Sequence, residues 1–260
     1  MLRANLSGKV ALVTGSSKGI GRAIALKFAE NGADIVVNAR NRAPALEVVE
    51  QVKGLGRKAC FERADIWNYQ EIKQMVHKAV QEFGQIDILV ASGGGGGAPP
   101  QPFHDIDPAL NIDTIESHLL SRLYCIRAVL DHMMERQRGK IIVITTDAGR
   151  TPTKGESLIG GAAAAVVLMT KVLAQEYARW QIRINTICTT VTKDTPGYEY
   201  AMANPDTPIF KIFKKAEERM PFGINKPDDI AQLALFLASE DSNQITGQIF
   251  SISGGLSFPG

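Results

Sequence analysis

A strand, a glycine-rich turn and a helix follow one another near the start of the chain. Val10–Val13 is an apolar run typical of a buried parallel strand, and an amphipathic helix continues from Arg22. The turn between them, from Thr14 to Gly21, reads TGSSKGIG. Glycines allow the backbone to approach a ligand closely, and the free N–H groups at a helix N-terminus favour phosphate. This order of elements predicts a site for the phosphates of a nucleotide.

Strands and helices alternate along the rest of the chain. Apolar strands are expected at 34–39, 58–65, 87–92, 140–145, 182–188 and 247–253, and helices at 43–55, 71–83, 112–135, 157–180 and from 227 onward. Because these strands are too apolar to face water on either side, they indicate a parallel sheet covered by helices on both faces. We therefore predict an α/β fold in which residues 1–260 form a single Rossmann-type, doubly wound domain with seven strands.

Composition narrows the range of partners. The 260 residues carry a net charge of +2, which is too small to argue for nucleic acid or a membrane surface. The three cysteines are far apart and have no metal-like spacing with the four histidines, so we expect no metal, and free thiols in a cytoplasmic, reducing compartment. No apolar run approaches the ~20 residues of a membrane span, so no membrane partner is expected.

Two segments outside the predicted strands and helices are candidate functional loops. Five consecutive glycines at 93–97 follow a strand whose end faces the ligand edge of such a sheet, which indicates a loop beside the site and not a linker. Residues 189–221 show no clear strand or helix pattern, and a long irregular stretch inside a compact domain is usually functional. We predict a substrate lid there, although its apolar side chains could equally form a small helical subdomain or contact a partner subunit.

Several motifs resemble those of the classical short-chain dehydrogenases/reductases, over a span from about Gly8 to Gly255. They are the TGSSKGIG turn, the pair at 65–66 after the third strand, DILV at 87–90, KIIVITT at 140–146, RIN at 183–185 and the glycine pair at 254–255. The resemblance implies a homotetramer that acts on a small molecule. It also implies a nicotinamide dinucleotide held by Gly15, Ser17, Lys18, Gly19, Ile20, Gly21, Asp65, Ile66, Ser92 and Gly93.

The end of the second strand bears on the choice of nucleotide. Family members that take NAD usually place an acid there, which accepts from the ribose 2′-hydroxyl. Here residues 38–41 read NARN and contain no acid, whereas Arg40 and Lys18 could pair with a 2′-phosphate through charge-assisted hydrogen bonds. Both side chains could also be solvated surface cations. We predict NADP as the cofactor, with NAD less favoured.

The family's catalytic set of Asn, Ser, Tyr and Lys is altered in this chain. Counting from the strand at 140–145, Thr146 stands at the Ser position and His118 at the Asn position. Ile159 occupies the Tyr position and Ala163 the Lys position, and neither can transfer a proton. We predict that Thr146 donates to a substrate oxygen and that His118 is the titrating group. The other candidates near the expected pocket are Asp147, Lys154, Glu156, Lys193, Asp194, Tyr198 and Tyr200.

Three classes of function remain open. The first is an NADP(H)-dependent oxidoreductase that acts on a small carbonyl/alcohol or imine-type substrate with a non-standard proton-transfer group. The second is a repurposed, non-redox enzyme such as an isomerase, lyase or cyclase. The third is a non-catalytic nucleotide-binding homologue that pairs with an active relative. The retained glycine turn favours the classes in which the protein still binds a nucleotide.

Overall fold

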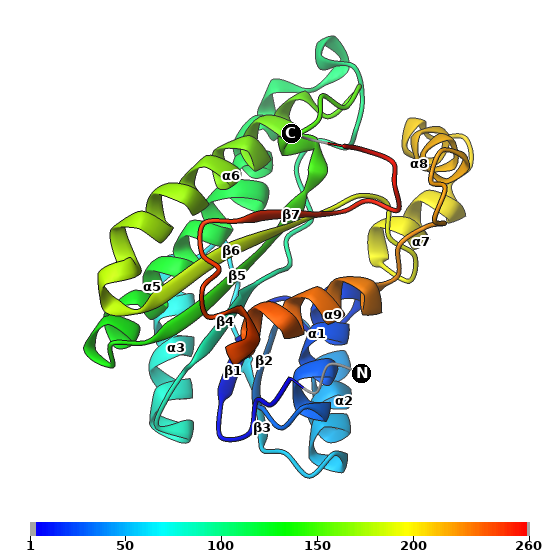
Figure 1. Ribbon diagram of the computed structural model, residues 1–260. Helices are drawn as coiled ribbons and strands as arrows, with labels where there is room; N and C mark the ends of the chain where they lie inside the picture. Colours follow the sequence, from blue (N-terminus) through cyan, green and yellow to red (C-terminus); the bar gives the residue numbers. More distant parts are fainter. Residues whose placement is uncertain (1–3, 259–260) are drawn as a thin grey trace.

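The computed structural model describes residues 4–258, and a seven-stranded sheet forms their centre (Figure 1). Every neighbouring pair of strands is parallel, in the order β3-β2-β1-β4-β5-β6-β7. The strands are β1 (Val10–Val13), β2 (Asp34–Ala39), β3 (Ala59–Arg63), β4 (Ile88–Ala91), β5 (Gly139–Thr146), β6 (Ile182–Thr189) and β7 (Ile249–Ile252). The predicted single-domain, doubly wound fold is therefore confirmed, and the chain order reverses between β1 and β4.

Helices cover both faces of the sheet, as the apolar strands predict. On one face lie α1 (Gly19–Glu30), α2 (Arg42–Gly54) and α9 (Pro227–Ala238), and on the other α3 (Tyr69–Phe83), α5 (Ser121–Glu135) and α6 (Ser157–Tyr177). The side chains of β1 alternate between the two cores. Ala11 and Val13 pack with the first group, and Val10 and Leu12 with the second. The strands at the centre of the sheet, such as β1 and β4, are thus buried on both faces.

The long helix expected at 112–135 is present but is not regular throughout. It begins as α4 (Asn111–Ile115), passes through a π-helical stretch (Glu116–Leu120) and continues as α5. A π stretch widens the turn by one residue and breaks the normal i→i−4 bonding, and such stretches are frequent at functional sites. The interruption lies at the end of the helix that faces the carboxyl edge of the sheet.

The expectation of an irregular segment at 189–221 is wrong. This segment contains α7 (Pro196–Ala203) and α8 (Pro208–Glu218), which stand away from the sheet (Figure 1). The prolines, which resemble helix breakers in the sequence, occupy first-turn positions where the missing N–H costs nothing. Thr195 caps α7 by accepting from the N–H of Tyr198 at 3.3 Å. Tyr198 in turn stacks on Phe213 of α8, with ring centroids 6.4 Å apart.

One helix is more apolar than the sequence analysis allowed. The stretch Ser157–Trp180, which contains α6, has 24 residues, and an 18-residue window in it reaches a mean hydropathy of 1.8, so by length and composition alone it could cross a membrane. This finding corrects the expectation that no apolar run approaches that length. One side of α6 packs on the sheet, where Val166 and Ala174 are buried. The other side leaves Leu168 64% and Val172 45% exposed.

Candidate functional site

A cleft of about 650 Å³ opens at the carboxyl ends of the strands. This is the edge at which doubly wound sheets bind their ligands, beside the point where the strand order reverses. The predicted cofactor residues and both predicted catalytic residues line it together: Gly15, Ser17, Lys18, Gly19, Ile20, Gly21, Arg40, Asp65, Ile66, Ser92, Gly93, His118 and Thr146. The structure thus brings these residues into one cleft, while their individual roles stay predictions.

The glycine-rich turn forms a close-packed cradle at the centre of the cleft. Thr14 fixes its base, since its Oγ1 donates to the carbonyl of Ser92 at 2.6 Å and accepts from the N–H of the same residue at 3.0 Å. Gly15 has a φ of +61°, and a Cβ there would lie 2.5 Å from Cα of Gly93. A Cβ on Gly21 would lie 2.5 Å from the carbonyl oxygen of Gly15. Only glycine permits this approach, which leaves room for a phosphate against the start of α1.

A buried amide holds the adenine end of the predicted site in shape. Asn38, at the end of β2, donates from Nδ2 to the carbonyls of Glu62 and Ala64, both at 3.1 Å. Its Oδ1 accepts from the N–H of Gly15 at 3.4 Å, so one side chain ties together the ends of β1, β2 and β3. Sequence reasoning missed Asn38. The available signal was a polar residue inside an apolar strand, because such a residue must find partners when it is buried.

The ribose and adenine contacts predicted from the family lie around this anchor. Asp65 follows β3, and its Oδ1 accepts from the N–H of Trp67 at 3.1 Å, which orients the carboxylate at the cleft. Arg40 and Lys18 are both exposed at the cleft's edge. The two cations are therefore near enough to the cleft to meet a nucleotide, and they remain solvated without one.

Thr146 and His118 form the opposite end of the cleft. Thr146 is the last residue of β5, and its Oγ1 accepts from the N–H of Ala148 at 3.3 Å. The imidazole of His118 forms no hydrogen bond with any described residue. Burial, with a smaller contribution from the charge of Arg122, lowers the pKa of His118 to about 4. His118 is therefore neutral at physiological pH and can donate from one ring nitrogen and accept at the other.

Ile159 and Ala163 lie on α6 and are absent from the lining of the cleft. Ile159 is half-buried. Ala163 is fully buried, and it packs against the turn after Thr146 so closely that a Cβ on Gly149 would lie 2.8 Å from the Ala163 methyl. At the two positions to which the sequence analysis assigned the family's reactive groups, this helix presents small or aliphatic side chains.

Arg122 is a cleft residue that the sequence analysis did not identify. It belongs to α5, is 8% exposed and lines the cleft beside His118. Its Nη1 donates to Oγ of Ser121 at 2.8 Å and to the carbonyl of Ser117, and its Nε donates to the carbonyl of Ile144 at 3.4 Å. Burial lowers its pKa to about 10, so the guanidinium remains charged near neutral pH.

Asp147 is turned away from the cleft, although it directly follows Thr146. It is 2% exposed, and its Oδ2 accepts from the hydroxyl of Ser251 at 2.7 Å and from that of Ser257. The other carboxylate oxygen has no partner among residues 4–258. It joins β5 to the last strand and the C-terminal segment, and it does not line the cleft, where the sequence analysis expected it.

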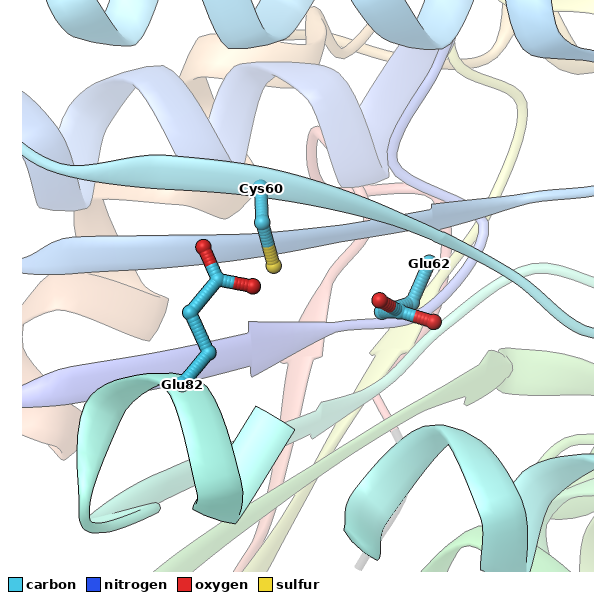
Figure 2. Close-up of side chains that lie close together, drawn as sticks. All are labelled: Cys60, Glu62 and Glu82. Carbon is cyan, nitrogen blue, oxygen red and sulfur yellow. The ribbon is translucent and has the colours of Figure 1, made fainter. Parts of the chain in front are cut away.

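A separate cluster of potential metal ligands lies on the edge strand β3 and on α3. Cys60, Glu62 and Glu82 point toward one another there (Figure 2), with their ligand atoms within 4.8 Å. Burial and the neighbouring carboxylates raise the pKa of the Cys60 thiol, which hydrogen-bonds to Glu82. Glu62 is also paired with Lys78 at 3.6 Å. The cluster lies at the edge strand, and none of its three residues lines the cleft.

The parallel sheet, the glycine turn and the cleft at the strand ends define a Rossmann-type α/β protein. The sequence pattern of the short chain dehydrogenase family matches residues 9–205 of this chain. The protein therefore belongs to the short-chain dehydrogenase/reductase family.

Characterised relatives match along almost their whole length. The 3-oxoacyl-(acyl-carrier-protein) reductase of Thermotoga maritima is 31% identical over 260 residues, covering 96% of this chain and 98% of the relative. The (2S)-((R)-hydroxy(phenyl)methyl)succinyl-CoA dehydrogenase subunit BbsD of Thauera aromatica is 33% identical over 263 residues, covering 97% and 98%. A 7α-hydroxysteroid dehydrogenase complexed with NADH and 7-oxo glycochenodeoxycholic acid superposes with a TM-score of 0.87 at 32% identity, covering 96% of this chain and 95% of that one.

Proposed function

We propose that this family member is an NADP(H)-dependent oxidoreductase that acts on a small carbonyl/alcohol or imine-type substrate without the family's Tyr–Lys pair. One observation carries the proposal. A single cleft unites the glycine-rich turn with Thr146 and His118, whereas Ile159 and Ala163 replace the expected proton-transfer groups on α6. The position of these two replacements follows from the spacing of the family motifs.

The residues present fit a nicotinamide nucleotide. The backbone contacts of Gly15 with Gly93, and of Gly21 with Gly15, form a cradle that a Cβ would fill. In this proposal the cradle and the first turn of α1 hold the pyrophosphate, and Asp65 holds the adenine. The chemistry that a bound NADPH supplies is hydride transfer.

Thr146 and the neutral His118 orient the substrate in the other half of the cleft. The Thr146 hydroxyl donates to a carbonyl oxygen or accepts from the N–H of an iminium, and the His118 imidazole supplies a second hydrogen bond. With a pKa of about 4, His118 is a poor reservoir of protons near neutral pH. A substrate that is already protonated, such as an iminium, needs no acid for reduction, which favours imine-type substrates, whereas the positive charge of the nearby Arg122 opposes the binding of any cation.

Arg40 and Lys18 support the choice of NADP over NAD, because the end of β2 offers cations and no acid. In a fluorescence titration with both nucleotides, Arg40→Asp is expected to reduce the ratio of NADPH to NADH affinity by about tenfold or more. Lys53→Asp is the matched control, because Lys53 is exposed on α2 and pairs with Glu50. Equal ratios before and after the Arg40 change would remove Arg40 from the ribose site.

The oxidoreductase proposal is tested by binding and turnover together. Wild-type protein is expected to bind NADPH in the micromolar range and to reduce cyclic iminium compounds in a panel that also contains ketones and aldehydes. The double variant Ile159→Tyr/Ala163→Lys introduces the missing pair, and Ile159→Phe/Ala163→Met controls for its bulk. If the panel is reduced only by the Tyr/Lys variant, the natural protein is not an ordinary reductase. If NADPH does not bind, the proposal fails.

A non-catalytic role beside an active relative is the second candidate. Replacement of the Tyr–Lys pair favours it, and so does the exposed apolar side of α6 with Leu168 and Val172. The same surface supports the homotetramer that we propose in the cytoplasm. Light scattering on wild type and Leu168→Lys tests the contact, since one charge in an apolar interface should dissociate it. NADPH binding with no turnover of the panel would favour the non-catalytic role.

A further inference from the structure

The proposed function does not account for the buried positive charge of Arg122. Its guanidinium is almost completely buried, and no carboxylate of residues 4–258 forms an ion pair with it. A buried charge is costly unless it is paired. Asp65 is the only carboxylate among the residues that line the cleft, and it belongs to the far, adenine end beyond β2. The end of the cleft near β4 and β5 therefore carries an unbalanced positive charge.

Two of the three guanidinium nitrogens of Arg122 donate hydrogen bonds within the protein. Nη1 satisfies the carbonyl of Ser117 in the π-helical stretch, and Nε reaches the carbonyl of Ile144 in β5. These contacts fix the guanidinium between the widened helix and the end of the sheet. No described residue accepts a hydrogen bond from Nη2, and Arg122, which is 8% exposed, lines the cleft. The third nitrogen is thus available to a ligand.

The place of Arg122 determines which part of a dinucleotide it would meet. The cleft runs from Asp65 and Arg40, beyond β3 and β2, across the glycine turn after β1, to Gly94 and Thr145 after β4 and in β5. A dinucleotide with its phosphates at the turn and its adenine near Asp65 has its nicotinamide riboside at the Arg122 end. The nicotinamide ring is positively charged when oxidised and neutral when reduced.

We propose that Arg122 makes the cleft bind NADPH in preference to NADP⁺, by placing an unpaired positive charge at its nicotinamide end while Nη2 donates to the nicotinamide ribose. The inference rests on the proposed function, because a nicotinamide nucleotide must bind. Neutral His118 adds no charge of its own. Arg122 is a positioning residue that determines which redox form of the nucleotide the cleft holds.

Isothermal titration with NADPH, NADP⁺ and an adenosine bisphosphate that represents the adenine half alone tests the inference. Wild type is expected to bind NADPH about tenfold more tightly than NADP⁺, the size expected for a partly buried charge. Arg122→Gln keeps a donor for the Ser117 carbonyl but removes the charge, so the preference should fall to about one. Arg122→Lys should retain much of it. Arg127→Gln, on the exposed side of α5, is the control.

The outcomes separate the two proposals. The adenosine bisphosphate should bind wild type and all variants equally, because it does not reach Arg122. If Arg122→Gln binds all three ligands but keeps the wild-type ratio, the Arg122 inference is wrong and the proposed function stands. If wild type binds NADPH and NADP⁺ with equal affinity, the Arg122 inference is likewise wrong and the proposed function stands. If wild type binds none of the three ligands, the proposed function itself is overturned. Thermal unfolding of each variant shows whether it is folded before titration.

Discussion

Replacing His118 by Asn should make the protein markedly less sensitive to acid. The pKa of His118 is lowered from 6.5 to about 4, and this is worth about 3 kcal/mol because each pKa unit corresponds to about 1.4 kcal/mol. The unfolded chain binds a proton at His118 below pH 6.5, whereas the folded protein does so only near pH 4. Stability from this group is therefore complete above pH 6.5 and is lost as the pH falls toward 4.

Urea unfolding at pH 7.5 and at pH 4.5 measures this effect. Between these pH values wild type should lose about 2.5 kcal/mol more unfolding free energy than His118→Asn, from the linkage between protonation and folding. Any pH-independent destabilisation by the substitution cancels in this comparison, as do the other titrating groups. His77→Asn, on the exposed side of α3, is the control and should behave as wild type. An identical pH dependence in wild type and His118→Asn would refute the burial of a neutral imidazole at the cleft.

Two further substitutions test the framework of the site. Gly21→Ala places a methyl group 2.5 Å from the carbonyl oxygen of Gly15, so the turn must shift; we expect a loss of about 1–3 kcal/mol in urea unfolding and at least a tenfold loss of NADPH affinity by fluorescence titration. Asp87→Asn leaves Arg136 without its buried partner at 3.1 Å, and it should cost about 3 kcal/mol in the same unfolding assay. Values near zero would contradict either account.

The sheet could be predicted from sequence because its central strands have no polar face. A strand buried on both sides is nearly continuous in apolar residues, so its position is visible without any partner, as at Val10–Val13. The nucleotide cradle could be predicted for a related reason. Its backbone contacts exclude every side chain, and therefore Gly15 and Gly21 mark the turn directly. The strands and the glycine turn can be recognised because each depends on a short stretch of neighbouring residues.

The parts that were missed depend on contacts with distant segments. Pro196 and Pro208 read equally well as the breakers of a loop or as the first residues of helices, and the choice rests on the packing of α7 against α8. Arg122 and Arg127 lie on the same helix and look alike in sequence. One is buried because the π-helical stretch and β5 supply carbonyl acceptors, while the other is exposed beside Asp131. Periodicity alone does not distinguish these two environments.

Two buried cysteines can report local opening of the folded protein. Cys125 lies one turn beyond Arg122 on α5, and burial raises the pKa of its thiol to about 12; the thiol of Cys188, in β6, is raised to a similar value. Only the thiolate reacts with alkylating reagents, so neither group is modified while the fold is closed. The alkylation rate of each cysteine therefore counts the openings of one part of the molecule. Cys125 lies on the same helix as the cleft residue Arg122. A nucleotide that slows the alkylation of Cys125 therefore stabilises this helix against local opening, and the decrease in rate measures that stabilisation without a chromophore or a substrate.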